Sequence, residues 1–294
     1  MSESVQLFRA RTPTLLPATH TNSYALGTRD VVLVEPATPF EDEQREWLTW
    51  ARAQSGQGRN LVGIVLTHHH LDHVGGAEVF ARELGLPIWA HEWTAGYFAK
   101  DRPDLVVSRH LREGEPIVLD GPRPERWDVL HTPGHAAGHV TLHSKDTSTL
   151  IVGDMVASVG TILIAKRDGG HMATYLRELE RLQHLNAKLA LPAHGDPIAN
   201  PSALFEHYIR HRLKREGVVL AALTAKTSAL TLDELLPQAY ADVDPAIFPI
   251  ARLSLEAHLE KLVEDGVVRE EDGGRFRAVA ATESTDATRA NRLV

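Results

Sequence analysis

The most constraining feature of this 294-residue chain is a run of potential metal ligands that directly follows an apolar segment. The segment Leu61–Leu66 has the length and the β-branched content of a buried strand, and Thr67–His73 continues it with the sequence THHHLDH. Four potential ligands stand within six positions of this continuation, namely His68, His70, Asp72 and His73. Scattered surface histidines do not account for this density at the end of a strand, so the segment predicts a metal centre.

The spacing of these residues predicts how they divide between two metal ions. In an extended segment alternate residues point the same way, so His68 and His70 can converge on one ion. Asp72 and His73 lie past a turn and can address a neighbouring ion. Zinc accepts both imidazole nitrogen and carboxylate oxygen as ligands. His69 points the opposite way, and we expect it to be structural.

Further candidates stand at the ends of later apolar runs and in a turn-rich loop. The runs at 149–152 and 189–191 end near Asp154 and His194, and the loop 132–139, with the sequence TPGHAAGH, contains His135. We do not expect His139, at the end of this loop, to coordinate a metal. A role beside the substrate and a structural role both stay open for it, and we place it with Asp72 among the catalytic candidates. Strands that alternate with helices and carry polar residues at their ends indicate an α/β protein.

The character of the chain changes beyond residue 203, which predicts a second domain. Three helices and a hairpin are expected, over 203–223, 232–240, 247–265 and 267–277, an order that resembles a winged-helix module. The expected divisions are a catalytic domain at 1–217, the module at 218–280 and a tail at 281–294. Residues 218–280 carry six Lys and Arg against eleven Asp and Glu, whereas winged helices that read DNA are basic. We therefore expect the module to serve packing or dimerisation.

Composition limits the remaining classes of function. Cysteine is absent, so nitrogen and oxygen must hold any transition metal. The net charge of −8 argues against a general nucleic-acid coat but not against a local basic groove. The first fifteen residues lack the apolar run of a signal peptide, and no segment approaches the roughly 18 apolar residues of a membrane helix. We expect a cytoplasmic protein that does not enter a membrane.

The HxHxDH pattern at 68–73, followed in order by His135, Asp154 and His194, resembles the signature of the metallo-β-lactamase superfamily. The resemblance implies an αββα sandwich that holds two divalent metal ions, with Zn2+ favoured. It assigns one ion to His68, His70 and His135, the other to Asp72, His73 and His194, and the bridging position to Asp154. It also implies a hydrolase in which a hydroxide shared by the metals, oriented by Asp72, attacks carbon or phosphorus.

A second element narrows the resemblance within this superfamily. The true zinc β-lactamases lack the bridging aspartate and many use a cysteine ligand, so we do not expect β-lactam hydrolysis. The segment His211–Glu216, HRLKRE, resembles the HRxxRE element of the β-lactamase-like-2 hydrolases, to which cleavage of single-stranded RNA is attributed. That likeness implies that His211, Arg212 and Arg215 contact substrate. Lys166 lies where this chain departs from those relatives, and it would suit an anionic substrate. Aspartate is commoner in those relatives at the position of Glu35. We expect this residue to lie behind the metal ligands and not among them.

Three enzymatic interpretations remain open on these grounds. The first is a binuclear hydrolase of a phosphodiester, such as single-stranded RNA, or of an ester-type substrate. The second is a small-molecule thioesterase or lactonase of the glyoxalase II type, and the third is a mononuclear iron persulfide dioxygenase. The expected partners are a small anionic substrate or single-stranded RNA, and a homodimer is possible. A purely regulatory protein is disfavoured because all seven ligand positions are filled.

Overall fold

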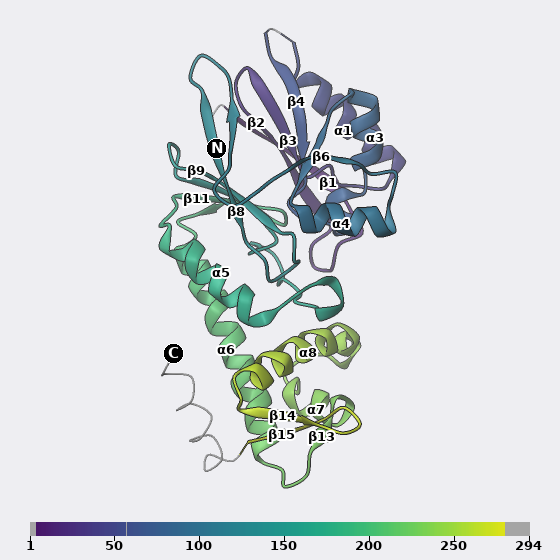
Figure 1. Cartoon of the computed structure of the whole chain (residues 1–294), viewed down its shortest axis with the longest axis vertical. Coiled ribbons are helices and arrows are strands. Elements are labelled where there is room, and N and C mark those ends of the chain that lie inside the picture. The colour runs from purple at the N-terminus through teal and green to yellow at the C-terminus, as the bar shows by residue number, and fades with distance from the viewer. Residues whose placement is uncertain (1–3, 57, 280–294) are drawn as a thin grey trace.

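The computed structural model describes residues 4–56 and 58–279, which form two stacked sheets between layers of helices and a smaller C-terminal domain (Figure 1). This arrangement is the αββα sandwich predicted from the sequence. Within the described ranges, no helix is both long enough and apolar enough to cross a membrane. The predicted tail at 281–294 lies outside the described residues.

The first sheet contains six strands in chain order, antiparallel at its first two pairs and parallel from β3 onward. Its strands are β1 (Val5–Arg11), β2 (His20–Leu26), β3 (Asp30–Val34), β4 (Asn60–Val65), β5 (Ile88–Ala90) and β6 (Val107–His110). The helices that accompany it are α1 (Glu41–Ala53), α2 (Leu71–Val74), α3 (Ala77–Leu84) and α4 (Glu92–Asp101). Trp47 of α1 stacks on Phe80 of α3 with ring centroids 3.8 Å apart, which joins these two helices over the outer face of the sheet.

The second sheet has the strand order β12-β11-β10-β9-β8-β7, with one parallel pair between β10 and β11. Its strands are β7 (Pro116–Leu119), β8 (Glu125–His131), β9 (Val140–Ser144), β10 (Thr149–Gly153), β11 (Leu189–Pro192) and β12 (Ile198–Ala199). The short helix η1 (Lys166–Asp168) and helix α5 (Met172–His184) follow β10. Apolar residues of α5 pack on the outer face of this sheet.

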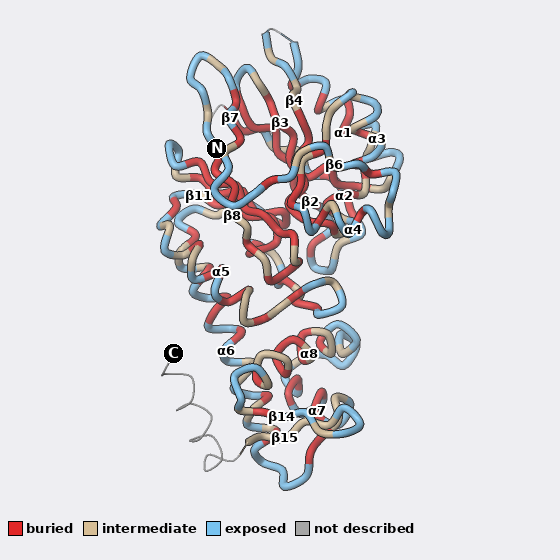
Figure 2. The backbone as a smooth tube through the Cα atoms, viewed as in Figure 1, coloured by how far each residue is buried: buried red, intermediate tan, exposed pale blue. Residues whose placement is uncertain are grey.

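The central strands are buried on both faces, which explains their uninterrupted apolar sequences. In β3, Val31 and Leu33 face the helices of the first layer, whereas Val32 and Val34 face the second sheet. In β10, Leu150 packs against α5 and Ile151 packs into the space between the sheets. Strand β10 was predicted from its apolar run, and Figure 2 shows the buried strands at the centre of the larger domain.

The C-terminal domain has its own apolar core. It consists of α6 (Ser202–Thr224), α7 (Leu232–Ala239), η2 (Pro245–Ile247), α8 (Phe248–Glu264) and a small sheet of β13 (Leu230–Thr231), β15 (Arg275–Ala278) and β14 (Val268–Glu271). The wing strands β14 and β15 pair as the predicted hairpin.

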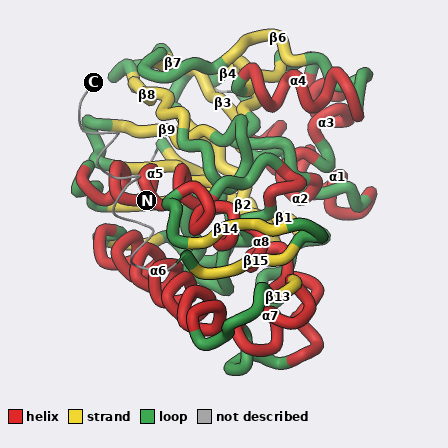
Figure 3. The backbone as a smooth tube through the Cα atoms, turned by 60° about the horizontal axis from the view of Figure 1, so that its bottom comes forward, coloured by secondary structure: helices red, strands yellow, loops and turns green. Residues whose placement is uncertain are grey.

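Helix α6 belongs to both domains. Phe205 and Tyr208 near its start pack into the core of the larger domain, and Val219 and Leu223 near its end pack into the C-terminal core. Figure 3 shows α6 as one unbroken helix. The boundary expected at residue 217 therefore falls inside a continuous helix, so no flexible linker separates the domains there.

Candidate metal centre

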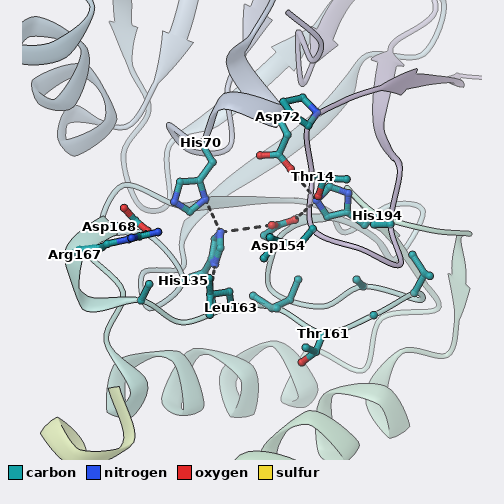
Figure 4. Close-up of a pocket in the computed structure, with 18 residues that line it drawn as sticks. Thr14, His70, Asp72, His135, Asp154, Thr161, Leu163, Arg167, Asp168 and His194 are labelled. Carbon is teal, nitrogen blue, oxygen red and sulfur yellow. Dashed lines mark hydrogen bonds and ion pairs between the residues drawn. The ribbon is translucent and has the colours of Figure 1, made fainter. Parts of the chain in front are cut away.

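The seven predicted ligands meet at one edge of the sandwich, where strands of both sheets end (Figure 4). The first sheet supplies the loop after β4 and the short helix α2, and the second sheet supplies the segments after β8, β10 and β11. These segments carry, in order, His68 and His70, then Asp72 and His73, then His135, Asp154 and His194. Polar residues collected from separate strand ends are typical of a functional site in an α/β protein.

Three histidine nitrogens converge on one point. His68 Nε2 lies 2.9 Å from His70 Nδ1, and His135 Nε2 lies 3.2 Å from the former and 2.9 Å from the latter. Nitrogen ligands about 2.0–2.1 Å from a tetrahedral zinc ion are separated by roughly 3.3 Å, so this spacing suits a cation held among the three.

A second group forms beside the first. His194 Nε2 lies 3.4 Å from Asp72 Oδ2, and His73 Nε2 lies 3.7 Å from the same oxygen. Asp154 contacts both groups, because its Oδ1 is 3.4 Å from His194 Nε2 and its Oδ2 is 3.5 Å from His135 Nε2. The carboxylate of Asp154 is thus placed between the two groups.

Several buried atoms of these residues lack a hydrogen-bond partner within the described chain. Among those that face the ligand groups are His73 Nε2 and Asp154 Oδ1. Polar atoms buried without hydrogen bonds are costly, and metal coordination is one way to satisfy them. The donor set of imidazole nitrogen and carboxylate oxygen, without sulfur, suits divalent zinc, iron or manganese. The residues present therefore fit bound metal ions.

Burial and nearby charges set different protonation states for the histidines of the two groups. Burial, aided by the neighbouring imidazoles, lowers the pKa of His68 and of His70, so both rings are neutral and offer lone pairs. Burial opposes protonation of His194 as well, but Asp154 and Asp72 outweigh it and raise the pKa of His194 to about 10. In the protein without metal, a proton on His194 offsets the two carboxylates, and a cation would replace it.

Contacts behind the ligands fix their ring orientations. His135 Nδ1 donates to the Leu163 carbonyl at 2.7 Å, and His194 Nδ1 donates to the His20 carbonyl at 3.0 Å. In both rings Nε2 is consequently the nitrogen that faces the centre, where it can bind a cation. Glu35, which follows β3, is buried with its Oε2 3.2 Å from His73 Nδ1, a placement that matches the supporting position expected for it.

The turn before His135 requires a glycine. Gly134 has a φ of +132°, and a Cβ there would lie 2.4 Å from Tyr175 Cα at the start of α5. Only a glycine allows this close approach of the loop to the helix. The contact sets the position of His135 relative to the second sheet.

His139 is fully buried and does not line the cavity of the centre. Its Nε2 accepts a hydrogen bond from the backbone N–H of Asp154 at 3.0 Å, and its Nδ1 lies 2.9 Å from Thr132 Oγ1. This placement favours a positioning role for His139, which holds the backbone of Asp154, over the catalytic role expected from the sequence.

The cavity at the centre has a volume of about 310 Å³. Besides five of the ligands, its wall includes residues 159–163, Arg167, Asp168 and the segment 13–15 between β1 and β2. Segment 13–15 carries no motif by which it could be recognised in the sequence. Lys166, predicted to contact substrate, instead forms an ion pair with Glu260 of α8 at 2.8 Å, and its neighbour Arg167 reaches the cavity.

The other residues predicted to bind substrate do not line this cavity. Arg212 is buried and donates through Nη2 to the Ile162 carbonyl and to Thr161 Oγ1, the latter at 3.3 Å. Arg215 forms a two-point ion pair with Asp242, at 2.8 and 3.0 Å, inside the C-terminal domain. Arg212 and Arg215 therefore make structural contacts in place of the substrate contacts expected for them. His211 is exposed on α6 and lies outside the cavity.

Known proteins share both parts of this architecture. The family model described as the metallo-beta-lactamase superfamily matches residues 16–194, and the beta-lactamase associated winged helix domain matches residues 231–276. The beta-lactamase-like protein 2 homolog of Caenorhabditis elegans is 27% identical over 290 residues, which cover 97% of this chain and 92% of that protein. The Drosophila melanogaster homolog is 26% identical over 267 residues, 87% of each chain.

A solved structure agrees over nearly the whole length. The metallo-beta-lactamase family protein from Thermus thermophilus superposes with a TM-score of 0.78 at 25% identity, covering 95% of this chain and 99% of that one. Both the sandwich and the domain after it are therefore shared, and the arrangement of the two is not particular to this chain.

Proposed function

This chain belongs to the metallo-beta-lactamase superfamily, and we propose that it is a hydrolase that binds two divalent metal ions, with zinc favoured, and cleaves an anionic ester-type substrate. The observation that carries the proposal is the position of Asp154. Its two carboxylate oxygens contact His135 of one ligand group and His194 of the other, within 3.5 Å. A single metal ion would occupy only one of these groups, and the convergence of the other group would then be unexplained.

The chemistry divides between the bound ions and the protein. When bound, two divalent cations lower the pKa of a water and stabilise negative charge on the oxygen of the attacked group. Asp72 lines the cavity, and the neighbouring His73 and His194 overcome its burial and hold its pKa at about 2. A carboxylate that stays ionised accepts hydrogen bonds over the whole physiological pH range, so Asp72 is suited to orient water.

The dimensions of the site support a small substrate. The cavity of about 310 Å³ admits a small molecule or one segment of a larger one, and Arg167 supplies a guanidinium at its wall. Among the residues expected to contact RNA, Arg212 is buried and Arg215 is paired with Asp242. We therefore favour a carboxylic ester, thioester or lactone, as in the glyoxalase II interpretation, over single-stranded RNA.

Metal content and a substrate screen test the proposal together. Protein reconstituted with zinc should hold two ions per chain and hydrolyse at least one anionic ester, thioester or lactone. Cleavage of single-stranded RNA with no ester turnover would instead support the phosphodiesterase interpretation. One tightly bound iron per chain, with no hydrolysis, would support the persulfide dioxygenase. The cytoplasmic location and the homodimer remain predictions.

A further inference from the structure

A second hollow lies beside the metal centre and shares part of its wall. It has a volume of about 720 Å³ and lies between α4, the loop 137–138 and the segment 167–169. The polar and aromatic side chains that line it are His69, Glu92, Trp93, Tyr97, Arg167 and Asp168. Arg167 and Asp168 also line the cavity of the centre, so the two hollows are adjacent.

Aromatic side chains form one side of this hollow. Trp93 is 63% exposed and Tyr97 is 42% exposed, although both are large apolar residues on the same helix. His69 lies against Tyr97 with ring centroids 4.0 Å apart and planes tilted by 35°. Exposed aromatic rings gathered beside a cavity are typical of binding sites, because their flat faces offer contact area at small entropic cost.

The position of His69 connects this surface to the centre. His69 stands between the ligands His68 and His70, but its ring lies against Tyr97 and belongs to neither ligand group. From the sequence, only a structural role was expected for His69. A single loop thus supplies ligands on one side and a wall of the second hollow on the other.

Charge at the boundary indicates which end of a ligand faces which hollow. Arg167 has 69% of its side chain exposed and lies 3.4 Å from Asp168 through Nε. Figure 4 shows this pair beside His70 and His135, on the side away from His194. A guanidinium at this point can hold an anionic group close to the metals, while an apolar ring extends past it.

We propose that this hollow, the aromatic subsite of Trp93, Tyr97 and His69, receives a planar ring of the substrate whose ester group lies at the metal centre. This inference rests on the proposed hydrolase function. The ring stacks on Tyr97 or Trp93, and Arg167 binds an anionic group between the ring and the reacting atom. A nucleobase and an aryl acyl group both have this chemistry, so the test separates them.

Calorimetric binding to the full-length, zinc-reconstituted chain compares two pairs of anions. Adenosine monophosphate is matched with ribose 5-phosphate, and 2-naphthoate is matched with hexanoate, so each pair differs by a ring. The wild type should bind the ring-bearing member of at least one pair more tightly. Trp93→Ala should reduce that preference by about tenfold, since stacking on one aromatic side chain has this order of effect. Tyr97→Leu should also reduce it, and Tyr97→Phe should keep it.

Val118→Ala is the matched control, because Val118 is a 60% exposed apolar residue outside both hollows, and it should leave all four affinities unchanged. A preference only for the nucleotide identifies the ring as a base, and one only for naphthoate identifies an aryl acid. No ring preference in the wild type, or a preference that Trp93→Ala and Tyr97→Leu leave intact, overturns the inference. Binding is measured without turnover, so a chain that hydrolyses nothing refutes the proposed function and leaves this result readable.

Discussion

Glu35 Oε2 lies 3.2 Å from His73 Nδ1, and both side chains are buried. Glu35 follows β3, and its backbone N–H donates to the Val65 carbonyl at the end of β4. The carboxylate that supports a metal ligand is therefore held by the same pair of strands that leads into the HxHxDH segment. This contact motivates the first prediction.

Glu35→Gln should weaken zinc binding by the group of Asp72, His73 and His194 about 10- to 100-fold, because the carboxylate raises the basicity of the ligand and fixes its ring. Competition with a chromophoric chelator measures the affinity. Glu180→Gln, an exposed site on α5, is the control and should change nothing. Equal affinities for the wild type and Glu35→Gln would show that Glu35 does not support the metal.

Asp154→Ala should lower zinc content from two ions towards one and reduce hydrolysis by orders of magnitude, since the remaining carboxylate, Asp72, belongs to one group only. His68, His70 and His135 should retain their ion. Elemental analysis after dialysis, with turnover of the best ester found, measures both effects. A variant that keeps two ions and full activity would remove Asp154 from the ligand set.

Arg212→Met should reduce the free energy of unfolding by about 1.5–3 kcal/mol, because the Ile162 carbonyl loses a charged, buried hydrogen-bond donor. Activity should fall equally on every substrate, since residues 159–163 line the cavity and Arg212 does not. Urea unfolding and a comparison of several substrates measure this. Arg210→Ala, at an exposed site on the same helix, is the control. A loss confined to RNA would restore the substrate contact expected from the sequence.

Because His258 is buried, we expect the folded protein to lose stability in mild acid. His258 is fully buried on α8, where Glu216, Lys261, Arg212 and Arg215 surround it. Burial lowers its pKa, although Glu216 opposes this, so the unfolded chain binds the proton more readily. Stability should therefore be retained above about pH 6.5, the ordinary value for histidine, and should fall below it.

In His258→Gln, the fall in the urea midpoint between pH 7 and pH 5.5 should be smaller than in the wild type. Both proteins are compared at each pH with the same excess of zinc, so that any destabilisation from metal loss in acid affects the two equally. The exposed His207→Gln provides the matched control and should follow the wild type. Parallel pH profiles for His258→Gln and the wild type would contradict the prediction.

The ligand set could be predicted from sequence because its motif is local and its chemistry is restrictive. Strands such as β10 and β11 were recognisable for a related reason, since burial on both faces leaves only apolar residues. Strand β9 was not recognised, because its buried positions include Thr141, His143 and Ser144. Polar residues in a buried strand remove the hydrophobic signal on which such predictions depend.

Side-chain direction in the C-terminal half could not be predicted in the same way. Lys166 and Arg167 are adjacent, and the short helix η1 turns one to Glu260 and the other to the cavity. Helix α6 has buried residues directed to two different cores, so no single apolar stripe identifies its inner face. Arg212 was expected to contact substrate, whereas it packs against Tyr175 of α5 and donates to residues 161 and 162.

Because α6 packs into both domains, it also fixes the rotation of one domain relative to the other about the helix axis. Each residue of an α-helix advances the chain by about 1.5 Å and turns it by about 100°. Inserting or deleting one residue between the part of α6 packed in the larger domain and the part packed in the C-terminal core would swing α8 around the helix axis. Glu260 and Glu264 would then leave Lys166 and His171, their partners at the segment that borders the cavity. The number of residues in α6 is therefore constrained as well as their identity. Related proteins with both domains should differ in the length of their loops and keep the length of this helix.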